Sequence, residues 1–310
     1  MQLVSSRTLL RAALLVGVGL GLAVALLHGV RRWPRPAGTT EAQLRETAGA
    51  IRPDVSDLVQ LRPVQDVDAP PTVVPDAALR ARPDQLSEAD VASLLAFLRN
   101  PGLPADWNWE RLRAGKNNAM DLLESASPAP PAWLETLIQM ARDARHDLIV
   151  REYAVQHIAS WYKRAPQRAE VVGALLDLAD GPEPGLAATA LVGLCHLAEA
   201  APAIPPAAIR RRALAWTAPE AAPLAQMTAF QVCARLGAGE ARIPVETAAR
   251  RAGPLSLRVS AISALGTLGA ISSRETLLGL AADSQPEIRK AAAAALLSLD
   301  ERLRTLSRGT

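Results

Sequence analysis

The chain repeats parts of itself, and this self-similarity limits its fold more than any other feature. Residues 185–200 align without gaps on residues 223–238 at an offset of 38, so that Cys195 falls on Cys233. Both segments place apolar residues at helical spacing. A unit of this length holds two helices that cannot bury their apolar face alone. The repeat therefore predicts a stack of helical hairpins.

A second repeat lies nearer the C-terminus. Residues 257–262 align on residues 288–293 at an offset of 31, and residues 150–155 take the same hydrophobic-Arg pattern. Hydrophobic residues make up 49% of the chain but aromatic residues only 3%, so Ala and Leu dominate and favour helices over strands. We predict an all-α fold, an α-solenoid of about six hairpins. Their expected ranges are 87–126, 132–165, 168–201, 206–239, 244–270 and 273–303.

These repeats resemble the HEAT family, above all its short bacterial form. The likeness is clearest at residues 256–270 and 283–299, where the second helix of the unit opens with a hydrophobic-Arg pair and continues with small residues. Asp283, Pro286 and Arg289 match the family's turn aspartate, helix-start proline and helix arginine. The resemblance covers roughly residues 87–303 and is faint in the first hairpin.

The repeat residues have structural roles in this interpretation. Pro286 suits the first turn of a helix because no amide donor is needed there, and Asp283 can accept hydrogen bonds from exposed amides. The arginines that recur at one repeat position are Arg151, Arg258 and Arg289. The resemblance implies that they pair with turn acids such as Asp147 and Asp283, which would hold neighbouring hairpins together.

The N-terminal part carries a signal of another kind. Residues 12–30 hold no charge over nineteen positions, which as a helix spans about 28 Å against a hydrocarbon core of about 30 Å. Arginines flank this run, and Trp33 follows it where an interfacial aromatic residue would lie. We predict a single-pass transmembrane helix at residues 12–30. A cleaved signal peptide is the competing interpretation, but residues 28–32 offer no small-x-small cleavage site.

The remaining segments complete the predicted organisation. Residues 1–11 are a short tail, residues 31–86 a proline-rich and largely disordered linker, residues 87–303 the solenoid, and residues 304–310 a C-terminal tail. Frequent prolines in the linker prevent long helices and favour a spacer. The arginines around the apolar run are nearly balanced, but the short basic N-terminus favours an inside start. That orientation would place the large domain outside the cytoplasm.

We predict no catalytic, cofactor or metal site. Cys195 and Cys233 align with apolar positions of other repeats, which indicates buried thiols rather than a disulfide or half a zinc site. The histidines outside the apolar run lack the i, i+4 partner of a helical metal site; they are His146, His157 and His196. The chain contains neither a GxSxG nucleophile motif nor a GxxxxGK[ST] phosphate-binding loop.

Arg210, Arg211 and Arg212 form the densest basic run, and they are the candidates for binding a partner's acidic patch or anionic headgroups. Three consecutive helical residues point in different directions, so a solvated surface is the commoner outcome. The net charge is only +3, and no basic stripe is interleaved with stacking aromatics. We therefore expect no binding of nucleic acid.

The sequence as a whole predicts a membrane-anchored HEAT-repeat scaffold that binds a protein partner through the solenoid groove and is not an enzyme. The alternative is a HEAT-like enzyme or enzyme accessory of the lyase type that acts on a bound small molecule. HEAT-like hydroxylases carry His-Glu pairs for iron, and this chain has no His-Glu dipeptide. The residues do not indicate the partner, the biological process or the oligomeric state.

Overall fold

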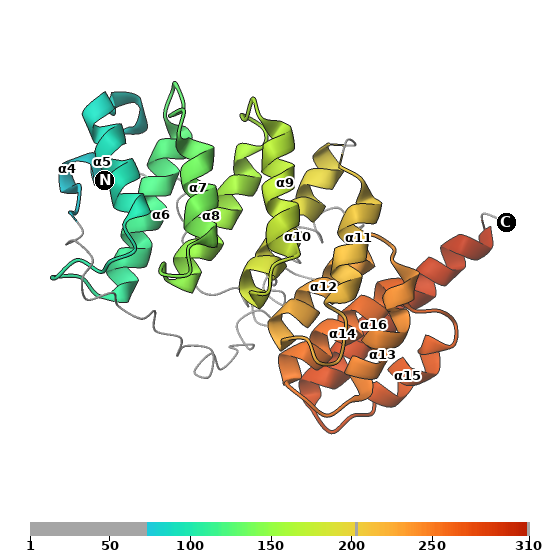
Figure 1. Ribbon diagram of the computed structural model, residues 1–310. Helices are drawn as coiled ribbons and strands as arrows, with labels where there is room; N and C mark the ends of the chain where they lie inside the picture. Colours follow the sequence, from blue (N-terminus) through green and yellow to red (C-terminus); the bar gives the residue numbers. More distant parts are fainter. Residues whose placement is uncertain (1–72, 202–203, 309–310) are drawn as a thin grey trace, which may run out of the picture. The chain divides into compact units, whose positions relative to one another are not determined.

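The computed structural model describes residues 73–201 and 204–308, and these residues form helices joined by turns (Figure 1). Within this described part, six helical hairpins follow one another along the chain. They are α5 (Glu88–Arg99) with α6 (Trp109–Ser125), α7 (Trp133–Arg142) with α8 (Leu148–Trp161), α9 (Arg168–Ala179) with α10 (Pro184–Ala200), α11 (Pro206–Ala215) with α12 (Pro223–Arg235), α13 (Arg242–Arg250) with α14 (Leu255–Leu268), and α15 (Ser273–Leu280) with α16 (Pro286–Arg308). The predicted all-α repeat solenoid is confirmed, and each predicted range corresponds to one observed pair, although α13 begins two residues before its range and α16 continues past the end of its range.

The hairpins build two layers. Each first helix packs on the second helix of its own hairpin, and each second helix also packs on the second helix of the next hairpin. We call α5, α7, α9, α11, α13 and α15 the first-helix layer, and α6, α8, α10, α12, α14 and α16 the second-helix layer. The buried apolar side chains between the layers form one continuous core. The stack is held together chiefly by the second helices.

Small residues allow the second helices to approach each other closely. A Cβ added to Gly266 of α14 would lie 3.1 Å from the Cα of Ala295 in α16, and one added to Gly193 of α10 would lie 2.9 Å from the Cβ of Ala159 in α8. Neighbouring second helices therefore touch almost backbone to backbone, which a larger side chain at these glycines would prevent.

Sequence signals at the helix ends explain the hairpin boundaries. Asp147 caps α8, because its Oδ1 accepts hydrogen bonds from the amides of Ile149 and Val150 at 3.1 and 3.3 Å. Gly237 ends α12 with a positive φ of 63°, and Ala238 N donates to Cys233 O at 2.9 Å, the bond that closes a Schellman motif. Asp147 therefore marks the start of one second helix and Gly237 the end of another.

The structure differs from the predicted organisation at both ends of the solenoid. Residues 76–85, assigned to the disordered linker, contain α4 (Asp76–Leu79) and the 3₁₀ helix η4 (Pro83–Gln85). Ala78 is buried, and Asn118 of α6 donates to the backbone oxygen of Leu79 at 3.0 Å. The prolines here precede or start short helices, and packing on α5 and α6 stabilises them. At the other end α16 continues to Arg308, into the predicted tail, because no Pro or Gly interrupts it.

Residues 1–72 lie outside the described part. The predicted tail at 1–11, the transmembrane helix at 12–30 and most of the linker therefore remain predictions. Of the helices within 73–201 and 204–308, none is long and apolar enough to span a bilayer.

Candidate functional site

A ladder of ion pairs joins successive hairpins along the turns between their first and second helices. Arg258 of α14 donates through Nη2 to Asp283 Oδ2 of the next turn at 2.8 Å, the pairing implied by the repeat arginines. Arg151 of α8 instead faces Glu183 at 3.9 Å. Its expected partner Asp147 is held by Arg113 of α6, at 2.7 Å between Nη2 and Oδ2. The ladder therefore links each arginine to the acid of the following hairpin.

The ladder arginines also bind the ends of first helices. Arg151 Nε donates to Ala141 O at 3.0 Å, and Arg258 Nε donates to Ala249 O at 3.3 Å. Cations at these positions complement the partial negative charge at a helix C-terminus. Arg289, in the last hairpin, donates to the backbone oxygens of Asp283 and Ser284 in its own turn. Pro286 begins α16, and Asp283 Oδ1 accepts from Gln285 N at 2.9 Å, as predicted for the turn.

The ladder is interrupted in the middle of the stack. The arginine position is the fourth residue of the second helix, and it is Ala187 in α10 and Gln226 in α12. The turn before α14, residues 251–254, contains no acid. Gln226 keeps only part of the arginine's role, because its amide donates to the backbone oxygen of Ala218. A rung of the ladder is the arginine of one second helix together with the acid of the following turn. Between α12 and α14, the arginine and the acid are both absent.

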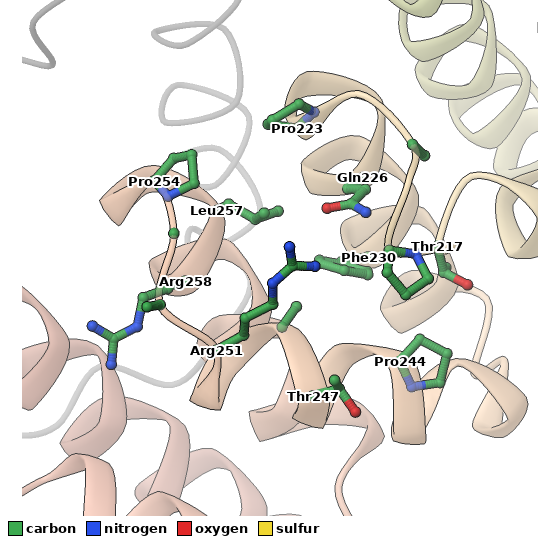
Figure 2. A pocket seen from close by; sticks show the side chains of 15 residues that line it. Thr217, Pro223, Gln226, Phe230, Pro244, Thr247, Arg251, Pro254, Leu257 and Arg258 are labelled. Atoms are coloured by element: carbon green, nitrogen blue, oxygen red, sulfur yellow. The ribbon is translucent and has the colours of Figure 1, made fainter.

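A cavity of about 140 Å³ lies at this gap (Figure 2). Its inner wall contains Phe230, which is fully buried, and Gln226, which is only 4% exposed. Leu257 and four prolines from the surrounding turns add further apolar surface: Pro219, Pro223, Pro244 and Pro254. The cavity is therefore lined by both hairpins, and it is apolar except for a few polar groups.

Arg251 is the cationic group at the cavity. Figure 2 shows its side chain extending toward Phe230 and Gln226, whereas Arg258 points away from the cavity. Arg258 is held by Asp283, but no residue of the described ranges forms an ion pair or a side-chain hydrogen bond with the exposed Arg251. The cavity thus combines an apolar wall with a guanidinium that lacks a carboxylate.

A second cavity of about 290 Å³ lies between the α6–α7 and α8–α9 connections. Trp133 and Trp161 line it together with prolines of both connections. Arg164 lies over the Trp161 ring at 5.1 Å and donates to Ala126 O at 2.8 Å. The indole Nε1 of Trp133 is buried and has no hydrogen-bond partner among the described residues. This cavity has an aromatic and proline lining but no cation without a partner.

The basic run at α11 is used largely within the stack. Arg212 donates to Asp180 of the preceding hairpin at 2.7 Å, and Arg210 pairs with Glu240 of the following one. Only Arg211 is exposed without an ion pair to a described residue. The three arginines thus divide between hairpin contacts and solvent, and they do not converge on one surface.

The two cysteines are buried free thiols, as the repeat alignment predicted. Burial raises the pKa of Cys195 to about 11 and that of Cys233 to about 12. A nucleophile or metal ligand needs the thiolate, which such pKa values suppress at neutral pH. Both thiols therefore act as small apolar groups of the core.

Sequence reasoning missed three buried ionisable groups in the first two hairpins. Lys116 donates through Nζ to Leu98 O at 3.0 Å at the end of α5, and burial lowers its pKa to about 7. Burial, followed by the charge of Lys116, lowers the pKa of His146 to about 3. Burial, followed by Asp147 and Glu183, raises the pKa of Glu152 to about 7. These residues belong to the ladder's surroundings, and no spacing rule marks them in the sequence.

The histidines of the described ranges do not belong to a cluster that could hold a metal ion. His157 Nδ1 contacts Glu124, but Ser160 Oγ donates to Glu124 Oε1 at 2.7 Å rather than to the imidazole. In a histidine-activated serine the hydroxyl donates to the imidazole, and Ser160 donates to a carboxylate instead. Within residues 73–201 and 204–308, no group of three or more His, Cys, Asp or Glu side chains is placed to hold a metal ion.

Fold and site together define an α-solenoid with an interrupted ion-pair ladder and a cavity at the interruption. No protein-family model matches the chain, and no curated protein does. Among solved structures it is similar to a designed armadillo repeat protein, with 19% identity over 73% of this chain and 100% of that one and a TM-score of 0.42. It is also similar to human deoxyhypusine hydroxylase in complex with glycerol, with 18% identity over 73% and 96% of the two chains and a TM-score of 0.30. At such TM-scores, the solenoid assignment rests on the helices of this chain itself.

Proposed function

We propose that the protein is a membrane-anchored, HEAT-like scaffold that binds a protein partner. The HEAT assignment is supported by the Arg258–Asp283 pair between hairpins and by Pro286 at the start of α16. The anchor is supported by the uncharged run at residues 12–30. In this proposal the solenoid lies outside the cytoplasm. Reporter fusions after Thr310 that are active on one side of the membrane test that orientation.

One observation carries the binding function: the exposed surface of the central second helices has no unpaired charge. On α8, α10, α12 and α14, the charged residues that are not buried are Glu199, Arg235 and Arg258, and all are in ion pairs. The other exposed side chains on these helices are mostly small or neutral and include Gln156, His196, Ser263 and Thr267. Cores of protein interfaces are depleted of charged residues in the same way.

The size of the cavities also favours a protein partner. Pockets for drug-sized ligands hold about 300–1,000 Å³. The cavities here hold about 140 and 290 Å³, which suits side chains of a partner better than a whole cofactor. A lyase-type function would place its small molecule at the larger cavity, where the Trp133 indole N–H has no acceptor within the described ranges. That function would also need a reactive group, and we assign none there.

A matched pair of charge insertions tests the scaffold function. Gln156→Arg places a cation on the exposed surface of α8, and Gln139→Arg places one on exposed α7 in the first-helix layer. The partner is cross-linked to the full chain in intact membranes and recovered with it by affinity purification. The amount of partner recovered should fall about tenfold for Gln156→Arg and should not change for Gln139→Arg. Equal recovery from both variants would refute binding through the second-helix layer. Turnover of a substrate by the purified chain, without any recovered partner, would refute the scaffold function altogether.

A further inference from the structure

We propose that the cavity between α12 and α14 binds the C-terminal residue of the partner polypeptide, with its carboxylate on Arg251 and its apolar side chain against Phe230. This inference rests on the proposed scaffold function and specifies which part of the partner is recognised. It uses the cavity of about 140 Å³, which we call the rung cavity because it lies where the ladder lacks a rung.

The ladder indicates which chemical group is missing. Where the ladder is intact, a guanidinium faces a carboxylate of the next turn, as in Arg113 with Asp147 and Arg258 with Asp283. At the rung cavity the chain supplies a guanidinium from Arg251 but no acid in residues 251–254. Because Arg251 extends toward the cavity rather than along the edge, a carboxylate from another molecule can complete the pair (Figure 2).

The helix starts beside the cavity add to the preference for an anion. Neither α12, which follows Ala222, nor α14, which follows Pro254, has a side-chain cap. The free amides in the first turns of these helices, which follow Pro223 and Pro254, carry partial positive charge. Both starts contribute lining residues, Pro223 to one side and Pro254 to the other. A carboxylate at Arg251 would therefore lie near two uncapped helix starts as well as the guanidinium.

The apolar wall distinguishes a chain terminus from an acidic side chain. Phe230 and Leu257 offer apolar surface next to the guanidinium, and the volume suits one side chain. A C-terminal residue carries a carboxylate and a full side chain on the same Cα. Its side chain can therefore pack against the apolar wall while its carboxylate pairs with Arg251. An Asp or Glu within a chain would bring its carboxylate on methylene groups alone. Capture of a terminal carboxylate is an established mode of peptide recognition.

The test uses the purified full chain and labelled hexapeptides that end in Leu, Ser or Asp, each as a free acid and as an amide. Fluorescence anisotropy should show binding of the Leu free acid, and amidation should weaken it by about 10- to 100-fold. Ser at the terminus should weaken binding by about tenfold, because it leaves the apolar wall unfilled. An amidated peptide with Asp in last place should not substitute for the free acid.

Arg251→Gln should weaken binding of the free-acid peptide that ends in Leu until it equals the binding of the amidated peptide. Arg211→Gln is the matched control, because it removes the same charge from another exposed arginine that has no ion pair within the described ranges. Both variants should keep the wild-type unfolding midpoint. Equal binding of acid and amide, equal binding by the two variants, or no binding at millimolar peptide overturns the inference.

The same variants separate this inference from the proposed function. If Gln156→Arg loses the cross-linked partner and Arg251→Gln keeps it, the rung cavity does not hold the partner's terminus and the scaffold function stands. If the peptides bind as expected but no partner is ever recovered, the cavity stands and the scaffold function fails.

Discussion

The first-helix and second-helix layers differ in how they use charge. Ion pairs between first helices are exposed, as in Arg142 with Asp177, whose side chains are 55% and 68% exposed. Between second helices and the turns of the next hairpin, Arg113 and Asp147 are 29% and 2% exposed, although Arg235 of α12 and Glu199 of α10 form an exposed pair. Two groups of the first layer depart from this pattern. Glu246 of α13 is buried among Arg242, Arg250 and Thr276, and Arg212 of α11 is 11% exposed in its pair with Asp180. The second layer therefore carries most of the interactions that fix the stacking, and the first layer supplies charged surface.

Removing one ladder arginine should have the largest effect. Arg113→Met leaves the buried Asp147 carboxylate without its cation, and we expect a loss of about 2–3 kcal/mol in unfolding free energy. Arg142→Met breaks an exposed pair of the first layer and should cost less than about 1 kcal/mol. Urea unfolding of the full chain, followed by circular dichroism, measures both. Equal losses would show that the two layers do not differ in this way.

Glu152 of α8 gives the second-largest effect, and it depends on pH. Its pKa is raised from 4.5 to about 7, so the folded protein binds this proton more tightly than the unfolded chain. The resulting stability is fully present below pH 4.5 and is lost as the pH rises through 7. Glu152→Gln keeps a neutral side chain at every pH and should therefore raise stability at pH 8 by about 2 kcal/mol.

The unfolding midpoint at pH 4 and pH 8 measures this difference. Glu170→Gln removes the same charge from an exposed position of α9 and should leave the pH dependence unchanged. A wild-type chain whose stability does not fall between pH 4 and pH 8 relative to Glu152→Gln would show that Glu152 is not held in an unfavourable charged state.

Replacing a glycine by alanine should change the stability in opposite directions in the two layers. A Cβ at Gly266 meets the backbone of Ala295 at 3.1 Å, so Gly266→Ala should push α14 from α16 and cost about 1 kcal/mol. A Cβ at Gly173 of α9 meets nothing within 4 Å. Gly173→Ala should stabilise by about 0.5–1 kcal/mol through helix propensity. Thermal unfolding of both variants checks the signs, and a stabilising Gly266→Ala would disprove the close approach.

The hairpins could be predicted from the sequence because each one is marked locally. Pro, Gly and Asp break the apolar pattern at every turn, and repeat alignment placed Cys195 and Cys233 in the core. The Arg258–Asp283 pair followed from the HEAT resemblance, since both residues stand at matching positions. Local signals therefore determined the elements and one rung of the ladder.

The remaining contacts depend on which hairpin follows which. Arg113 escaped prediction because it is the fifth residue of α6, one place later than the other ladder arginines. Because Arg113 pairs with Asp147, Arg151 pairs with Glu183 instead. This choice of partners depends on how the hairpins pack. The rung cavity did leave a signal, namely Gln226 at the arginine position and a turn without an acid. Reading departures from the repeat, and not only agreements, would have located it.

The basic run of α11 should give the smallest effect. Arg210 and Arg212 pair with acids outside α11, Glu240 and Asp180, with arginine side chains 41% and 11% exposed, whereas Arg211 has no ion pair to a described residue. Replacing Arg210 and Arg212 together by Gln should lower the melting midpoint by about 2 °C at low salt, and Arg211→Gln should not change it. High salt should reduce this loss, because the Arg210–Glu240 pair is exposed and therefore screened. A salt-independent loss would mean that this first-layer run acts like the buried ladder. The contrast between the layers would then be limited to the hairpins that contain Arg113 and Arg258.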